Sequence, residues 1–182
     1  MIYIMRHGMT DWNKMRKLQG RTDIPLNDEG RAMAEQAAIE YKDMPFDVCY
    51  CSPLVRADET ARIFLKGRDV PIITDQRLAE MSFGDYEGVE NSFDMPDCPI
   101  NLIFQKPEEY KDSVGGAETF DELFERTGSF LREVVEPLEI QGKRVLIIAH
   151  GALNSCLICQ RKHLPLEQFW SSGIPQCKIM EV

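Results

Sequence analysis

Short hydrophobic runs alternate along the chain with longer segments of mixed polarity. Such runs, bounded by turn-forming residues, are typical of β-strands. The run at 145–149 has no polar alternation, which indicates a strand buried on both faces of a sheet. The predicted strands lie at residues 2–5, 46–51, 71–74, 145–149 and 177–182.

The segments between these runs carry helix signals. Asn27 is placed to cap a helix that starts at residue 28. Pro53 suits the first turn of a helix. Thr119 and Glu122 have the spacing of a capping box. Helices are predicted at 28–42, from Pro53, from Thr119 to about Pro137, from Gly151, and near 166–170.

Strands that alternate with helices favour a mainly parallel sheet covered on both faces. We therefore predict an α/β fold, a three-layer α/β/α sandwich with a mainly parallel central sheet. A chain of 182 residues fits a single domain, residues 1–182. Residues 82–117 are irregular and rich in glycine and proline, and we expect 89–116 to form a lid or insertion.

The net charge and the lack of long apolar runs limit the partners and the compartment that we expect. A net charge of −9 argues against nucleic acid or an anionic membrane as a partner, since both select basic surfaces. The five residues before Arg6 are too few for a signal peptide, and no apolar run approaches the ~20 residues of a membrane span. We expect a cytoplasmic protein.

Six cysteines leave two interpretations open. A zinc site could combine Cys49 and Cys51 with the C-x-x-C pair Cys156 and Cys159. Free buried thiols are favoured, because helix spacing puts the second pair on one face without a knuckle turn. No metal and no cofactor are expected.

Two of the three histidines share one local setting. His7 and His150 each follow the carboxyl end of a predicted buried strand, where parallel α/β sheets bind ligands. Arg6 and Arg56 can reach the same edge. Two histidines and two arginines at one crevice make an anion site suited to phosphate.

A cysteine-based phosphatase is excluded by spacing. Its phosphate loop needs five residues between cysteine and arginine, whereas Cys51 and Arg56 are separated by four. Pro53 also removes one of the backbone N–H groups that such a loop requires.

Six motifs occur in a recognisable order, and together they make the chain resemble the histidine phosphatase superfamily, the phosphoglycerate mutase-like group, over nearly its whole length. They are RHGMTDWN (6–13), LQGRTDIPLNDEG (18–30), CSPLVRADETA (51–61), LAEMSFGDYEG (78–88), GGAETFDEL (115–123) and IIAHGALN (147–154).

The resemblance implies that His7 is a nucleophile that becomes transiently phosphorylated. Glu80 would give the leaving oxygen its proton. The remaining groups would hold the phosphoryl group or line the substrate side: Arg6, Arg56, His150, Asn13, Gln19, Gly20 and Thr22. The physics agrees for His7, because neighbouring arginines lower its pKa and a neutral imidazole is the competent nucleophile.

Three functions remain open. Two are enzymes, a phosphomonoester phosphatase and a phosphoglycerate mutase-type phosphotransferase, and the third is a catalytically silent binding module. Mutases of this group have a longer insertion rich in basic residues, whereas 89–116 offers only Lys106 and Lys111 among several acids. The phosphatase is therefore favoured. The silent module is disfavoured because every member of the predicted catalytic set is present.

We expect a phosphorylated small molecule as the substrate. Relatives within the resemblance act on sugar phosphates, α-ribazole phosphate, phosphoserine or phosphohistidine proteins, and the sequence selects none of them. Apolar residues of 89–116 are expected mainly to pack this segment onto the domain; they are Phe93, Ile100, Leu102, Ile103 and Phe104. Since the printed chain stops at Val182, directly after the last strand, a rather open pocket is expected.

Overall fold

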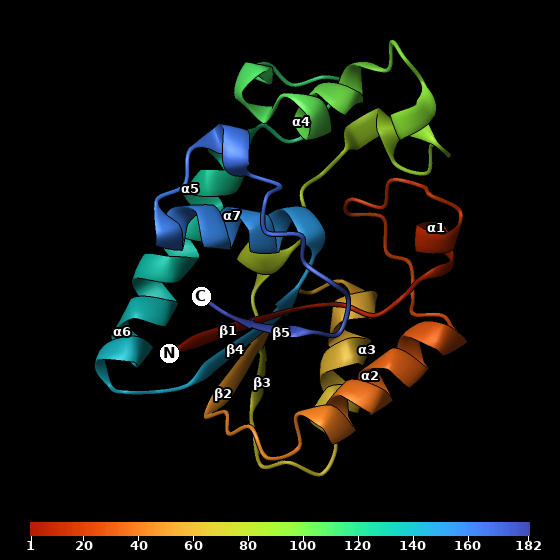
Figure 1. Cartoon of the computed structure of the whole chain (residues 1–182). Helices are drawn as coiled ribbons and strands as arrows, with labels where there is room; N and C mark the ends of the chain where they lie inside the picture. The colour runs from red at the N-terminus through yellow and green to blue at the C-terminus, as the bar shows by residue number, and fades with distance from the viewer.

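The computed structural model describes all residues, 1–182, and has one five-stranded sheet at its centre (Figure 1). Its strand order is β3-β2-β4-β1-β5, in which the first four strands are parallel and β5 is antiparallel to β1. The predicted mainly parallel α/β fold is confirmed. The strands are β1 (Ile2–Arg6), β2 (Val48–Cys51), β3 (Ile72–Thr74), β4 (Val145–Ala149) and β5 (Ile179–Glu181).

Helices cover both faces of the sheet. On one face lie α2 (Asp28–Glu40) and α3 (Val55–Phe64), and on the other α5 (Phe120–Phe130) and α7 (Gly151–Lys162). The remaining α-helices are short: α1 (Asp11–Lys14), α4 (Leu102–Gln105) and α6 (Glu136–Ile140). No helix is long and apolar enough to cross a membrane.

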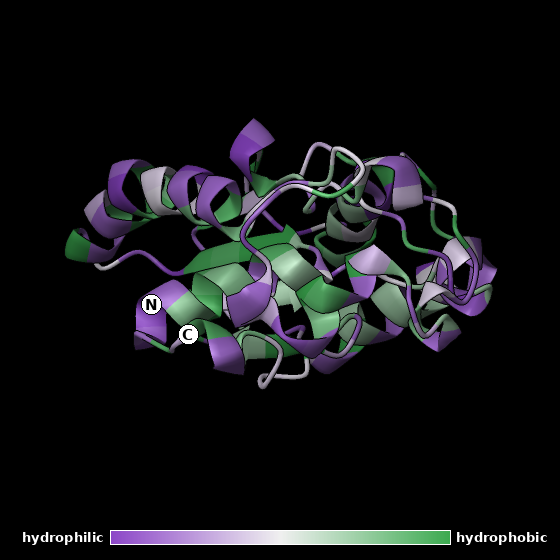
Figure 2. Ribbon diagram, turned by 90° about the horizontal axis from the view of Figure 1, so that it is seen from above, coloured by the Kyte–Doolittle hydropathy of each residue, from purple (hydrophilic) through white to green (hydrophobic).

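Strand alternation divides the core into two clusters. Ile2 and Ile4 point toward α5 and α7, whereas Tyr3 and Met5 point toward α2 and α3. Every residue of β4 is buried, in agreement with its uninterrupted apolar sequence. Seen from above, hydrophobic colour fills the middle of the molecule and hydrophilic colour the outer helices (Figure 2).

Several helix boundaries differ from the prediction. The helix predicted at 28–42 ends at Glu40, and the one predicted near 166–170 is a 3₁₀ turn at Leu166–Gln168. The second helix begins at Val55, two residues after Pro53. The helical stretch that starts at α5 does not end near Pro137 but continues to Ile140 through a π-helical turn at Leu131–Val135. The wider turn lets the helix continue past a proline that cannot donate the usual backbone hydrogen bond.

Residues 89–116 form short 3₁₀ turns and α4, and they lie at one end of the molecule, in green in Figure 1. Ile100 and Ile103 are fully buried in the larger core cluster. The Trp170 indole N–H donates to the Ile103 carbonyl oxygen at 2.8 Å. Packing onto the domain is thus the role of these isoleucines, as the sequence predicts.

The two cysteine pairs lie on opposite faces of the sheet. Cys49 and Cys51 belong to the cluster under α2 and α3, and Cys156 and Cys159 to the cluster under α5 and α7. A zinc site that uses both pairs is therefore impossible. All six cysteines are free, and burial raises the pKa of Cys51 far above its usual range, so this thiol is no nucleophile.

Candidate active site

The register of two neighbouring strands brings the two histidines together. β1 and β4 are paired so that Arg6 is opposite Ala149, and the His7 N–H donates to the Ala149 carbonyl oxygen at 3.0 Å. His7 and His150 are the next residues on each strand. Their ring centroids lie 5.1 Å apart, as expected for residues at the carboxyl ends of adjacent parallel strands.

His7 is held in the form that can attack. Its Nδ1–H donates to the Gly8 carbonyl oxygen at 2.7 Å, so in the neutral ring the lone pair is on Nε2. The Arg56 Nε–H points to that nitrogen at 3.3 Å. The pKa of His7 is well below its usual range, mainly through burial and further through the positive charges of Arg56 and Arg6. Burial therefore lowers the pKa of His7 more than the charges of the two arginines do, whereas the sequence analysis considers only the arginines.

His150 has no exposed surface, and Ser52 holds it. Its Nε2 is hydrogen-bonded to the Ser52 hydroxyl at 2.6 Å, and its Nδ1 is buried without a partner. Burial, followed by the charge of Arg56, keeps the pKa of His150 well below its usual range. Ser52 is a contact of His150 that the sequence analysis does not predict, although it lies inside the motif CSPLVRADETA.

Two arginines supply positive charge beside the histidines. Arg56 is buried, and its guanidinium donates to the carbonyl oxygens of Gly20 at 2.7 Å and Thr22 at 2.9 Å. Burial lowers its pKa to about 10, so it stays charged at neutral pH. The Arg6 Nε is buried without a partner. Loss of hydration lowers the pKa of Arg6, and the charge of Glu80 partly offsets this shift.

Glu80 is buried at the N-terminus of α7. Its carboxylate accepts backbone N–H groups of Met81 at 2.9 Å, Leu153 at 3.0 Å and Ala152 at 3.2 Å. A helix N-terminus is a favourable place for a carboxylate. Three donors fix the position of this side chain at the cavity wall.

The loop that follows β1 contributes two amides to the cavity and one residue that stays out of it. The Gln19 side-chain oxygen accepts from the Thr10 hydroxyl at 2.8 Å, and the Asn13 side-chain oxygen accepts from the Thr10 N–H and the Gln176 amide, both at 3.0 Å. Both side chains line the cavity and keep their NH₂ groups as donors. Thr22 does not line the cavity, since its hydroxyl and its N–H both donate to Glu87. Its carbonyl oxygen acts indirectly, by holding Arg56.

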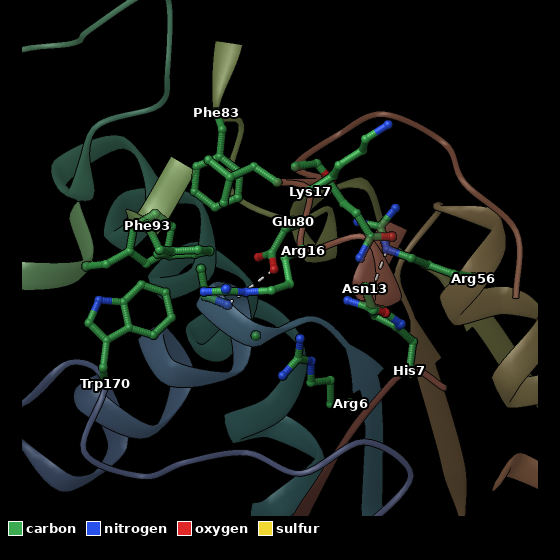
Figure 3. A pocket seen from close by; sticks show the side chains of 16 residues that line it. Arg6, His7, Asn13, Arg16, Lys17, Arg56, Glu80, Phe83, Phe93 and Trp170 are labelled. Atoms are coloured by element: carbon green, nitrogen blue, oxygen red, sulfur yellow. Dashed lines mark hydrogen bonds between the residues drawn. The ribbon is translucent and has the colours of Figure 1, made fainter. Parts of the chain in front are cut away.

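These groups line one cavity of about 290 Å³ at the carboxyl edge of the sheet (Figure 3). Of the predicted site residues, Arg6, His7, Asn13, Gln19, Gly20, Arg56 and Glu80 line it, whereas Thr22 and His150 do not. Arg16, Lys17 and Trp170 also line the cavity and were missed. No group of three or more histidine, cysteine, aspartate or glutamate side chains is placed to hold a metal ion.

Comparison with known proteins shows the family to which the chain belongs. Residues 2–182 match the family described as the histidine phosphatase superfamily (branch 1). The phosphatase PhoE of Bacillus subtilis is 35% identical over 160 residues, covering 87% of this chain and 76% of that protein. The solved structure of Bacillus stearothermophilus YhfR has a TM-score of 0.86 and 32% identity, covering 100% of this chain and 90% of that one. The α-ribazole phosphatase of Shigella flexneri has a TM-score of 0.82 and 27% identity, covering 98% and 87%.

Proposed function

Because the chain belongs to the histidine phosphatase superfamily, we propose that it hydrolyses phosphomonoesters of small molecules through a phosphohistidine on His7. The observation that carries the proposal is the state of His7: a buried neutral imidazole whose Nε2 lone pair lies beside two guanidinium groups. Phosphoryl transfer needs a positioned nucleophile and fixed positive charge around the phosphoryl oxygens.

The first half-reaction uses the groups that surround the cavity. The Nε2 lone pair of His7 attacks phosphorus, and the bond between phosphorus and the ester oxygen breaks. Glu80, in its protonated form, gives its proton to the departing oxygen. Arg6 Nε, a buried donor without a partner on a residue that lines the cavity, suits the phosphoryl oxygens. His150 does not line the cavity and contacts the site through the ring of His7.

The second half-reaction returns the enzyme to its starting state. Glu80, now a carboxylate, takes a proton from water as the water oxygen attacks the phosphorus of phospho-His7. The bond between nitrogen and phosphorus breaks, the lone pair returns to Nε2, and inorganic phosphate leaves. Splitting one displacement into two lowers the barrier. No metal or cofactor takes part in this proposal.

A mutase is the second candidate, because two additional cations line the cavity. Lys17 could bind a second anionic group, as an intermolecular phosphoryl transfer requires, whereas the Arg16 guanidinium is already paired with Asp94 at 2.8 Å. A relative from Gloeobacter violaceus, 29% identical over 180 residues, is named a 2,3-bisphosphoglycerate-dependent phosphoglycerate mutase. Against it, Lys106 and Lys111 of residues 89–116 do not reach the cavity. A protein phosphohistidine phosphatase uses the same nucleophile and remains a narrower alternative.

Two further features belong to the proposal. Residues 89–116 act as a lid over the cavity of a single catalytic domain, since Phe93 and Phe104 come from this segment and line the cavity.

The free cysteines fit a reducing compartment, and we place the protein in the cytoplasm.

The experiment is phosphate release from p-nitrophenyl phosphate in EDTA, by wild type, His7→Asn, His7→Ala and the control His163→Asn. The control alters an exposed histidine whose φ of +51° asparagine tolerates. We expect turnover by wild type and the control and none by His7→Asn or His7→Ala. Acid quench of wild-type enzyme should trap an acid-labile phosphohistidine. Turnover retained in His7→Ala would refute the nucleophile, and turnover lost in EDTA would refute a metal-free reaction.

A further inference from the structure

The cavity has two chemically different ends. His7, Arg6 and Arg56 form the end that suits the phosphoryl group. Figure 3 shows the side chains of Phe83, Phe93 and Trp170 together on the side away from His7 and Arg56, with Glu80 between the two groups. The leaving group of a substrate that occupies the first end must therefore extend past Glu80 toward the aromatic side chains.

We name this second group of side chains the aromatic wall; it consists of Phe83, Phe93, Phe104 and Trp170. Its rings contact one another through Phe104. The ring centroid of Phe104 lies 5.6 Å from that of Phe83, 4.8 Å from that of Phe93 and 5.3 Å from that of Trp170. Two of these pairs are tilted and one is edge-to-face, and together the rings make an aromatic surface against which another ring can pack.

Resting on the proposed function, we propose that the physiological substrate is the phosphate ester of an alcohol that carries a flat aromatic or heteroaromatic group. The phosphoryl group binds between Arg6 and Arg56, the ester oxygen faces Glu80, and the ring packs on the aromatic wall. A cavity of about 290 Å³ lies at the small end of ligand sites, which suits one compact ring system.

The charges around the cavity disfavour an amine on the leaving group. Glu80 is the only carboxylate that lines the cavity, and its oxygens already accept three backbone N–H groups. Lys17 adds positive charge on the lining, and Arg16 lies there paired with Asp94 at 2.8 Å. An ammonium group would lose water and meet like charge without a carboxylate partner, so phosphoserine-type substrates fit poorly.

The wall can be altered without disturbing the core. Phe93 is 42% exposed, so a smaller side chain there leaves no buried void. Met95 is a matched control, because it belongs to the same segment, is 45% exposed and does not line the cavity.

The test compares kcat/KM for four esters of primary alcohols: phenethyl, cyclohexylethyl and ethyl phosphate, and phosphoethanolamine. In wild type we expect phenethyl phosphate to exceed ethyl phosphate by at least about tenfold, because the ring loses contact with water. It should exceed cyclohexylethyl phosphate by about threefold, because only a flat ring stacks. Phosphoethanolamine should be the poorest substrate.

Variants then assign the preference to the wall. Phe93→Ala and Phe104→Leu should lower the ratio of phenethyl to ethyl phosphate toward one, whereas Met95→Ala should leave it as in wild type. A wild-type ratio near one, or equal rates for the phenethyl and cyclohexylethyl esters, overturns the aromatic assignment. A ratio that neither wall variant changes also overturns it.

Failure of this inference can be distinguished from failure of the proposed function. Hydrolysis of all esters without an aromatic preference, lost in His7→Ala, leaves the phosphatase intact and refutes only the substrate class. If no ester is hydrolysed, the phosphatase fails. Calorimetry then compares phenethylphosphonate with ethylphosphonate: equal affinities overturn the aromatic wall as a binding surface, and tighter phenethylphosphonate binding that is lost in Phe93→Ala supports it.

Discussion

The buried histidine pair should make the fold sensitive to mild acid. His7 is 2% exposed and His150 0% exposed, and the folded state lowers the pKa of both. An unfolded chain binds protons at these rings near pH 6.5, whereas the folded chain does not. Protons therefore favour the unfolded state, and the stability that these neutral histidines provide above pH 6.5 is lost as the pH falls below it.

The size of the effect follows from linkage. Between pH 7.5 and pH 5.5, each histidine that stays neutral in the folded state lowers the free energy of unfolding by roughly 1.4 kcal/mol. His7 and His150 together should lower it by about 3 kcal/mol, a large part of the ~5–15 kcal/mol that stabilises a typical domain. Carboxylates with ordinary pKa values near 4 titrate below this interval.

The assay is urea unfolding in phosphate-free buffers at several pH values between 5.5 and 7.5, since phosphate would stabilise the folded state by binding. His7→Asn and His150→Asn should each remove about half of the decrease in the free energy of unfolding between pH 7.5 and pH 5.5. The double variant should remove nearly all of it. His163→Asn is the matched control, because this exposed residue has φ of +51°, which asparagine tolerates. A wild-type loss below about 1 kcal/mol, or one that persists in the double variant, refutes buried neutral histidines.

Three further outcomes are expected. Ser52→Ala removes the hydrogen-bond partner of His150 and should lower kcat about tenfold with a smaller change in KM. Ser52→Thr should restore much of the lost kcat. Equal kinetics for wild type and both variants would show that Ser52 does not position the His150 ring. Glu80→Gln should slow alkyl phosphates at least about 100-fold more than p-nitrophenyl phosphate, and a uniform loss would exclude it as the acid. Gly20→Ala should lower stability by about 1–3 kcal/mol in urea, since φ is +54° and the new Cβ would overlap Glu87; unchanged stability contradicts this.

The sequence predicts those features that depend on strand order and on the ends of strands. Apolar runs locate all five strands, and the rule that parallel strands end at one edge places His7 and His150 together. Arg6 directly precedes His7, and Arg56 comes shortly after the strand predicted at 46–51, so both arginines are expected at the same edge. The family resemblance, confirmed by the family match, adds Glu80, whose place beside α7 depends on a loop that no periodicity predicts.

Other features depend on loop conformation, which the pattern of residues does not encode. Arg16 and Lys17 face the cavity because residues 16–18 pair with 88–91, with hydrogen bonds such as Asn91 N–H to the Arg16 carbonyl oxygen at 3.1 Å. Trp170 reaches the cavity because its indole is tied to Ile103. Thr22 shows the opposite outcome: its place in a motif suggests a binding side chain, yet Glu87 holds that side chain away from the cavity.

The acid sensitivity and the proposed chemistry have one structural cause. A nucleophilic imidazole must be neutral, and burial beside guanidinium groups keeps His7 neutral. The same burial excludes water from the second ring, His150, so both histidines oppose protonation in the folded state. A variant that opens the site to solvent, and so brings the pKa of His7 back toward its ordinary range, should lose less stability than wild type between pH 7.5 and 5.5, and should lose activity in mild acid. The pH dependence of stability and that of turnover should therefore change in opposite directions when this pair is exposed.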